Sequence, residues 1–431
     1  MLALDVGTSS VRAQRFDERG EPAGELRQER YETDDPDEVA AAARHVLAGE
    51  EPAATSCFAH SLVAVDASWN PLTPILGWRD TRSAGAAEQL ARRLDAEAVH
   101  ARTGAFLHPS FWPAKLAWLG ETEPDAFRRA AWFVSFADYL RGSPETSLSM
   151  ASSSGLLDLT TRDWDEELLA TLGVDRERLP RIADVPLWVD AACSNAGAGC
   201  TTRERAALMV GTSGALRVLY EPERPPQPKP GLFLYLAGER RVVEGGALSD
   251  GGNLQGWLEE TLAKGASNTV LQGGAGWLAG RDPRDHGLVF LPFLGGERST
   301  GWKPHARGTV HGLTFETTPL DIRQAAYEGV AFRFAAIADL LPDVREVVAT
   351  GGALLHDRDW IQIMADALAR PITVSAVPEA SLRGAALFAL EAAGREIAEA
   401  PTAGVVEPRA DRAEAYRAAR AEQQRLYDAL T

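Results

Sequence analysis

The sequence predicts an α/β protein built from two similar halves. The first observation is a repeat: an apolar run, a Gly-Thr-Ser turn and a second, alternating run occur once around Gly7 and again around Gly211. These two glycines lie 204 positions apart, close to half of the 431-residue chain. The second observation is that strand-like and helix-like segments alternate through the rest of each half, which is typical of α/β folds with partly parallel strands.

Each copy of the repeat predicts a hairpin of two strands joined by a tight turn. Further buried strands are expected at residues 63–66, 208–210, 288–291 and 347–349, and helices at 84–95, 320–341, 358–369 and 411–429. A proline-rich run at 225–230 has the composition of a linker, but in register with the first copy it is the far turn of the second hairpin. We therefore predict a boundary near residue 203, with domains at 1–203 and 204–431.

Composition excludes several classes of function. The chain has 44 Lys and Arg against 61 Asp and Glu, a net charge of −17, which argues against binding to a nucleic-acid backbone. There is no stretch of ~18 apolar residues that would span a membrane, and the first residues lack the basic region of a signal peptide. Three cysteines without metal-ligand spacing suit a reducing cytoplasm. We expect a cytoplasmic protein without a nucleic-acid or membrane partner; monomer and homodimer both stay open.

The Gly-Thr-Ser turns have the chemistry of a phosphate site. Each offers unobstructed backbone N–H groups and two hydroxyls, although any tight hairpin can contain one such turn. Two turns, one in each half, could clamp a polyphosphate across a cleft. Asp5 in the first copy corresponds to Met209 in the second. A carboxylate beside phosphate is favourable when a divalent cation such as Mg²⁺ lies between them. The sequence contains no P-loop, so a nucleotide would be held in another way.

Nine short motifs follow one another in the order of a known family. They lie at residues 5–12, 78–82, 190–199, 211–214, 245–253, 295–299, 306–313, 350–353 and 379–386. In these motifs the chain resembles the FGGY carbohydrate kinases of the actin/Hsp70/hexokinase superfamily, from residue 2 to about residue 393. The resemblance implies two duplicated ribonuclease H-like (actin/hexokinase-type) domains with a cleft between them. It also implies ATP and Mg²⁺ as cofactors, and transfer of the γ-phosphate to a hydroxyl of a sugar.

The resemblance assigns a role to residues on the nucleotide side. Asp190 matches the general base of the family, although aspartate is equally favoured as a helix N-cap. Asp5 would face hydrated Mg²⁺. The residues that would contact the nucleotide are Thr8, Ser9, Arg12, Gly211, Thr212, Gly251, Gln255, Gly351, Gly352 and His356.

The sugar side is implied by the same resemblance. The residues expected there are His60, Ser61, Asp80, Arg82 and Ser110. The sequence of residues 60–66, 107–115 and 246–253 is most similar to the gluconate kinase branch. A gluconate kinase needs a cation near the substrate carboxylate, and Arg82 or Lys115 could supply it. Lys115 could equally extend along a helix surface. Another kinase of pentuloses or polyols, such as a xylulokinase, is the alternative.

The segment before Asp190 departs from the family. Pro186, Leu187, Trp188 and Val189 stand where the family has glycines, and a β-branched valine adopts positive φ only at high cost. The segment from residue 179 to Asp190 is also short. We favour an active, trimmed kinase. A catalytically silent sugar- or nucleotide-sensing protein is the alternative of another class, and an actin- or chaperone-like ATPase is a third.

Overall fold

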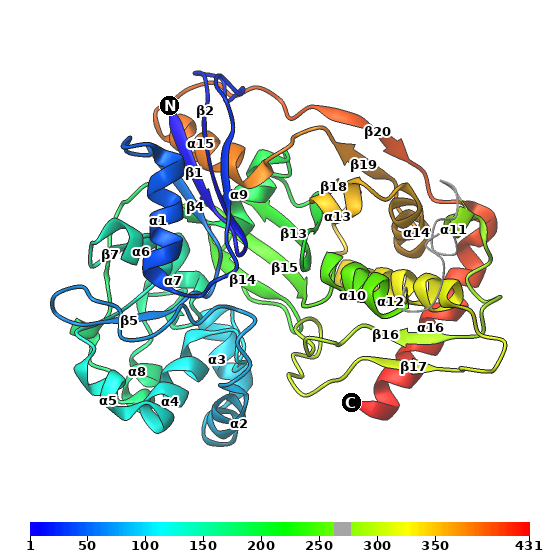
Figure 1. Ribbon diagram of the computed structural model, residues 1–431, viewed down its shortest axis with the longest axis horizontal. Helices are drawn as coiled ribbons and strands as arrows, with labels where there is room; N and C mark the ends of the chain where they lie inside the picture. The colour runs from blue at the N-terminus through cyan, green and yellow to red at the C-terminus, as the bar shows by residue number, and fades with distance from the viewer. Residues whose placement is uncertain (263–276) are drawn as a thin grey trace.

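The first half is organised around a five-stranded sheet, seen at the upper left of Figure 1. The computed structural model describes residues 1–262 and 277–431. In spatial order the strands are β3 (Arg27–Arg30), β2 (Ser10–Arg15), β1 (Leu2–Val6), β4 (Ala54–Cys57) and β11 (Leu187–Val189). β1 pairs antiparallel with β2, and β2 with β3, whereas β1, β4 and β11 run parallel.

The second half repeats this arrangement inside a seven-stranded sheet. Its strands, in spatial order, are β14 (Phe233–Leu236), β15 (Val242–Leu248), β13 (Gly214–Tyr220), β12 (Arg205–Val210), β18 (Glu346–Thr350), β19 (Ile372–Ser375) and β20 (Thr402–Val406). The five central strands, β15 to β19, have the same order and directions as those of the first sheet. The α/β fold and the duplication predicted from two short sequence repeats are thereby confirmed.

Both repeated motifs form the predicted hairpins. In the first, Val6 pairs with Val11, and in the second Val210 pairs with Gly214, so the second turn is shorter. Packing requires a glycine at position 214, because a Cβ there would lie 2.5 Å from the ring of Phe334. The Gly-Thr-Ser sequences therefore lie at the tips of two equivalent hairpins, one in each sheet.

The strand that follows the proline-rich run does not pair with the second hairpin. It follows β13, as the repeat predicts, but the next strand, β14, pairs with β15 at the edge of the sheet. β14 has no counterpart in the first sheet, where β3 follows β2 directly and pairs with it. An edge strand was thus added after the duplicated hairpin, and the sequence pattern did not predict it.

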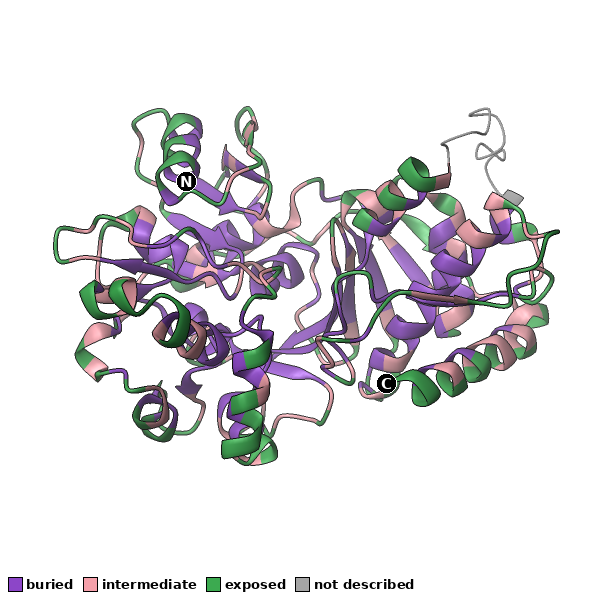
Figure 2. Cartoon of the chain, turned by 60° about the horizontal axis from the view of Figure 1, so that its bottom comes forward, coloured by how far each residue is buried: buried purple, intermediate pink, exposed green. Residues whose placement is uncertain are grey.

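Helices cover the sheets, and the buried strands lie beneath them in both halves (Figure 2). α1 (Pro36–Leu47) packs on the first sheet, and α12 (Pro319–Asp339) packs on β13 and β15. Besides α15, described below, the described residues of the second half form α10 (Gly252–Leu262), α11 (Trp277–Gly280), α13 (Gly352–Leu355), α14 (Arg358–Leu368) and α16 (Ala413–Leu430). Within the described ranges, no helix has the length and apolar character needed to cross a bilayer.

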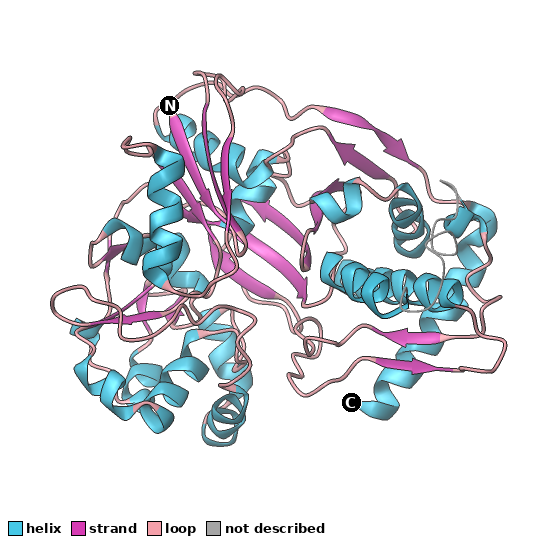
Figure 3. Cartoon of the chain, in the orientation of Figure 1, coloured by secondary structure: helices cyan, strands magenta, loops and turns pink. Residues whose placement is uncertain are grey.

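A long insertion between β4 and β11 forms the lower left of Figure 3. It contains α2 (Ala84–Arg93), α3 (Ala96–Thr103), α4 (Trp112–Thr122), α5 (Pro124–Arg129), α6 (Phe136–Arg141), α7 (Leu148–Ser153) and α8 (Glu166–Leu172). Its short strands are β5 (Val63–Val65), β6 (Trp132–Val134), β7 (Glu145–Thr146), β8 (Leu157–Asp158), β9 (Asp163–Trp164) and β10 (Arg181–Ile182). The strand expected at 63–66 thus pairs with β6, outside the main sheet. Likewise β16 (Val289–Leu291), expected at 288–291, pairs only with β17 (Thr309–His311).

Two helices cross between the sheets and connect the halves. α9 (Asp190–Gly197) follows β11 and packs on β13, whereas α15 (Ala380–Ala392) follows β19 and packs on β1 and β4. A Cβ on Gly197 would lie 1.8 Å from the carbonyl oxygen of Ala380, and one on Gly384 would lie 1.8 Å from that of Cys193. The crossing therefore depends on two glycines. It fixes the start of α9, and with it Asp190, between the two sheets.

Candidate active site

Asp190 is the first residue of α9. Val189 before it is extended, with φ −64° and ψ 137°, so β11 passes directly into the helix without a glycine turn. The valine predicted a turn unlike the glycine turn of the family, and the extended backbone at Val189 confirms this. Backbone amides of Ala59 and Ala191 face the carboxylate, but burial has the larger effect and raises the pKa of Asp190 to about 6. A carboxylate with such a pKa accepts a proton readily near neutral pH.

Charges from both hairpins act on Asp190. Arg217 on β13 lowers its pKa and Asp5 on β1 raises it, so both charges are close to the Asp190 carboxylate. Arg217 also donates a hydrogen bond from Nη2 to Ser194 Oγ, one turn further along α9, at 2.7 Å. One residue of each hairpin therefore contributes to the electrostatic environment of this carboxylate.

Asp5 has the properties expected of a residue that faces a cation. It is 4% exposed, and its Oδ1 has no hydrogen-bond partner among the described residues. Burial raises the pKa of Asp5, with Arg12 as the main opposing charge. The described chain contains no cluster of three or more His, Cys, Asp or Glu side chains. Mg²⁺ commonly binds through one or two carboxylates, waters and substrate phosphates, so Asp5 fits that mode.

Arg12 contacts acidic groups from both halves. Its Nη1 lies 3.4 Å from Asp5 Oδ2, and its Nε lies 3.1 Å from Oε2 of Glu379, the residue before α15. The guanidinium is thus held beside the first turn by two carboxylates. A nucleotide phosphate that contacted Arg12 would compete with these two partners.

The turn residues themselves are accessible. Thr8 is half-buried, and Ser9 and Thr212 are exposed, so their hydroxyls are open to a ligand. Tyr31 donates from its hydroxyl to the carbonyl of Gly7 and braces the first turn. In the second, the N–H of Gly252 donates to Gly211 O at 2.7 Å and ties α10 to the turn.

The glycines predicted to contact the nucleoside differ in what surrounds them. A Cβ on Gly351, which has φ 87°, would lie 2.5 Å from Val210 O, and one on Gly251 would lie 2.7 Å from the Ser213 carbonyl carbon. These two glycines allow close packing around the second hairpin. A Cβ on Gly352, by contrast, would have its nearest neighbour 3.8 Å away, on the ring of His356. Gly352 therefore borders open space.

The two other predicted nucleotide residues lie on the same side of the second half. His356 is exposed, with Nδ1 2.6 Å from the carbonyl oxygen of Gly352. Gln255 is half-buried on α10. The structure thus groups the predicted nucleotide residues of the second half around one turn and the helices packed on it.

The predicted sugar residues do not all converge. His60 has φ 66°, and its Nδ1 lies 2.6 Å from Ser153 O; burial lowers its pKa well below the ordinary value, so the ring is neutral. Ser61 Oγ accepts a hydrogen bond from the Phe136 amide at 3.1 Å. Lys115 is 1% exposed and donates to the carbonyls of His60 and Leu76, rather than extending along a surface.

Asp80 and Arg82 form an ion pair, with Nη2 and Oδ2 2.6 Å apart, and Arg82 is exposed. They line a cavity of about 400 Å³ with Thr8. Ser110 lines another cavity, of about 450 Å³, together with Ser249 and other residues of the second half. Three of the five predicted sugar residues are therefore divided between two cavities.

Sequence reasoning missed three residues that surround Asp190: Arg217, Tyr235 and Arg298. All three are buried, and each affects or is affected by the Asp190 charge. A signal was available, because an arginine within an otherwise apolar strand, as in residues 214–220, is rarely buried without a partner. Arg298 lies in one of the recognised motifs, but no role was assigned to it.

Comparison with known proteins identifies the family of the chain and supports its fold. The chain is 28% identical to a gluconokinase of Bacillus subtilis (strain 168), over 92% of this chain and 88% of that one. The structure resembles a ligand-bound xylulose kinase of Lactobacillus acidophilus, with TM-score 0.86 and 25% identity, and a gluconate kinase of the same species, with TM-score 0.84 and 25% identity. Each comparison covers 100% of this chain and 98% of the other. Models of the N- and C-terminal domains of the FGGY carbohydrate kinases match residues 51–190 and 206–393, and the chain therefore belongs to the FGGY family of carbohydrate kinases.

Proposed function

We propose that this ATP-dependent carbohydrate kinase phosphorylates gluconate at its primary hydroxyl to give 6-phosphogluconate, with Asp190 as the general base. The observation that carries the proposal is that Asp190 begins α9, which follows β11 of the first sheet and packs on β13 of the second, so that charges of both hairpins act on it. Phosphoryl transfer to an alcohol requires an acceptor for the hydroxyl proton where the two phosphate-binding turns meet.

The roles of the chain's residues follow from their positions. The amides and hydroxyls of the turns at Thr8 and Thr212 hold phosphate oxygens, and Arg12 adds positive charge. Asp5 holds hydrated Mg²⁺ through its unpartnered Oδ1. When bound, ATP with Mg²⁺ supplies the phosphoryl group and neutralises its charge. Asp190 takes the proton from the substrate hydroxyl.

Gluconate is favoured over a neutral sugar by two considerations. The similarity to the B. subtilis gluconokinase extends over 92% of this chain. Buried cationic side chains, Arg217 and Arg298, also lie around the proposed base. A xylulokinase is the second candidate, because the xylulose kinase of L. acidophilus has a comparable TM-score of 0.86. The cytoplasmic location, the domain boundary at residue 203 and the choice between monomer and homodimer stay predictions.

An ADP-release screen tests the proposal. Purified protein with ATP and Mg²⁺ is offered gluconate, xylulose, ribulose, glycerol and related polyols, and the product is identified by mass spectrometry. We expect the highest kcat/KM with gluconate and a product phosphorylated on C6. Preference for xylulose would replace the substrate assignment. Ligand binding without ADP release from any acceptor would instead favour the silent sensor.

A further inference from the structure

Among the buried side-chain donors of the second half that lack a hydrogen-bond partner, three belong to residues whose charges interact with Asp190. They are Nε of Arg217, Oη of Tyr235 and Nε of Arg298, and none has a hydrogen-bond acceptor among the described residues. The three side chains come from β13, from β14 and from the loop after β16. They are 4%, 1% and 7% exposed, so bulk water does not readily satisfy these donors. An unsatisfied buried donor is costly, and a bound ligand that accepts a hydrogen bond would remove that cost.

Arg217 and Tyr235 lie on β13 and β14, on either side of β15, and Arg298 donates to Leu248 on that same strand β15. Arg298, Asp190 and Arg217 all act on the phenol of Tyr235, and burial raises its pKa well above the ordinary value. The ring of Tyr235 meets the ring of His60 edge to face, with centroids 5.7 Å apart. His60 was expected on the sugar side from sequence alone. One of the three side chains, Tyr235, therefore contacts a residue expected on the sugar side.

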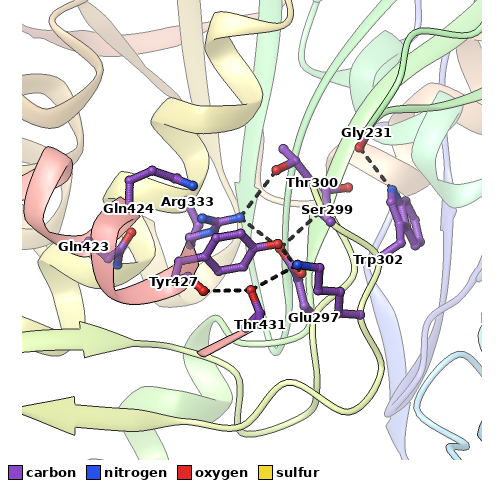
Figure 4. A network of polar contacts seen from close by, with 12 residues as sticks. Gly231, Glu297, Ser299, Thr300, Trp302, Arg333, Gln423, Gln424, Tyr427 and Thr431 are labelled. Carbon is purple, nitrogen blue, oxygen red and sulfur yellow. Dashed lines mark hydrogen bonds and ion pairs between the residues drawn. The ribbon is translucent and has the colours of Figure 1, made fainter. Parts of the chain in front are cut away.

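The direction of Arg298 is fixed by its neighbour. The carboxylate of Glu297 points into the second half, where it accepts hydrogen bonds from Arg333 at 2.9 Å and from Tyr427 at 2.8 Å (Figure 4). Arg298 extends away from this network and places its guanidinium 4.4 Å from the ring centroid of Trp78 in the first half. Its Nη2 donates to Leu248 O at 2.8 Å. A residue of the second half is thus held rigidly against the first.

Neither arginine has a counter-ion in contact. No described carboxylate oxygen lies within 4.0 Å of the guanidinium nitrogens of Arg217 or Arg298. Asp250 is close enough to Arg298 to raise its pKa, but burial raises the pKa of Asp250 itself to about 7, so its charge is incomplete at neutral pH. Burial lowers the pKa of Arg298 to about 10, which leaves it charged. Asp190 is the main opposing charge for Arg217 and also acts on Arg298, so one carboxylate faces two buried guanidinium groups and a second anion would offset the remaining charge.

The cations expected from sequence are engaged elsewhere. Lys115 donates to two backbone carbonyls, and Arg82 is exposed and paired with Asp80. The charge for an acidic substrate must therefore come from other residues. The transferring phosphate already has the two turns and Arg12, which leaves Arg217 and Arg298 as buried cations for a carboxylate.

We propose that Arg217, Tyr235 and Arg298 bind the carboxylate of a sugar-acid substrate, so that selectivity for acids over neutral polyols is determined by the second half of the chain. This inference rests on the proposed function, since it takes the acceptor to bind beside Asp190. Arginine binds a planar carboxylate through two parallel hydrogen bonds, and a phenol adds a third.

The test compares two acceptors of the same carbon number, gluconate and the neutral hexitol glucitol, in wild-type protein and in Arg298→Gln and Tyr235→Phe. Calorimetry measures binding of each acceptor and of a non-hydrolysable ATP analogue, and steady-state kinetics measure kcat and KM. We expect Arg298→Gln to weaken gluconate binding by about 10- to 100-fold and Tyr235→Phe by about 3- to 10-fold. Binding of glucitol and of the nucleotide should change less than about threefold.

Tyr220→Phe is the matched control. It also removes a buried phenol hydroxyl from the second sheet, one that donates to Glu244 at 3.2 Å, and it should leave the gluconate-to-glucitol ratio unchanged. Equal loss with both acceptors would mean a structural role and would overturn the proposal. Loss of nucleotide affinity with gluconate binding intact would identify phosphate as the anion and would also overturn it.

Experiment can refute the carboxylate site and the proposed kinase function separately. A wild-type protein that phosphorylates neutral polyols and does not bind gluconate would overturn this inference and leave the kinase assignment standing. A wild-type protein that releases no ADP with any acceptor would overturn the proposed function. Calorimetry with gluconate would still decide the role of the three donors in that case.

Discussion

Arg12 and Glu379 form an ion pair between the two halves of the chain, with Nε and Oε2 3.1 Å apart. Arg12 belongs to the second strand of the first hairpin, and Glu379 precedes the helix that crosses α9. The pair is partly buried, with side-chain exposures of 22% and 27%. It therefore joins the first hairpin to the segment that connects the sheets, and a nucleotide phosphate bound at Arg12, as we propose, would compete with this pair.

Replacing each partner separates the proposed role of Arg12 in binding phosphate from its role in the ion pair with Glu379. Arg12→Gln removes a charged contact to phosphate and should raise the KM for ATP by about tenfold or more. Glu379→Gln leaves the guanidinium in place and removes a competitor, so the KM for ATP should stay the same or fall. Steady-state kinetics with saturating acceptor measure both values. If Glu379→Gln raised the KM as much as Arg12→Gln, Glu379 would instead be needed to position Arg12.

The pKa of Asp190 predicts an acid limb in the pH profile. Burial raises this pKa from 3.8 to about 6, and the nearby Asp5 adds to the increase. A base must be ionised to accept a proton, so kcat/KM for the acceptor should be half-maximal near pH 6. It should fall about tenfold for each further pH unit downward. A profile that is flat from pH 5 to 8 would contradict the assignment of Asp190 as the base.

Lys115 should make stability rise with pH. Burial lowers the pKa of Lys115 from 10.5 to about 7, so between these values the unfolded chain binds a proton that the folded chain does not. The free energy of unfolding of the wild type, relative to Lys115→Met, should therefore increase by about 2 kcal/mol from pH 7 to pH 9. Urea titrations at the two pH values measure this difference.

Lys115→Met also removes the donor to the carbonyls of His60 and Leu76, which should cost about 1–3 kcal/mol at pH 9. Methionine retains the apolar stem, so packing is a small part of the change. A pH-independent difference between the two proteins would mean that the amine stays charged when buried.

The crossing of α9 and α15 predicts a large effect from one methyl group. Gly384→Ala would place Cβ 1.8 Å from the carbonyl oxygen of Cys193, and the helices must separate to admit it. We expect a loss of about 3 kcal/mol and lower activity, because the same displacement moves Asp190. Gly85→Ala on α2 is the control, since nothing lies within 4 Å of a Cβ there. Thermal unfolding measures both variants, and equal Tm values would contradict the role of the crossing.

The fold could be predicted from sequence because its signals are local. The hairpins at Gly7 and Gly211 are encoded by apolar runs and a turn, and their spacing reveals the duplication. The edge strand at Phe233–Leu236 could not be predicted, because it pairs with a strand that follows it, instead of with the hairpin before it. A repeat in sequence specifies only the elements that both copies share.

The site was predicted in part for a similar reason. Asp5, Asp190 and the two turns lie in contiguous motifs, and the structure brings Asp5 and Asp190 close together. The environment of Lys115 could not be predicted, because its partners, His60 and Leu76, are distant in the sequence. The role of Arg298 could not be predicted, because it is inferred from the absence of an acceptor for its Nε among the described residues. Only the packed structure shows that absence.

Turnover of Asp190→Asn is the most direct measurement. The amide keeps the size of the side chain and cannot accept the hydroxyl proton, so kcat should fall by about 10²- to 10⁴-fold. Calorimetry should show that binding of ATP and acceptor changes much less. Near-normal kcat in this variant would contradict the claim that the Asp190 carboxylate is the catalytic base.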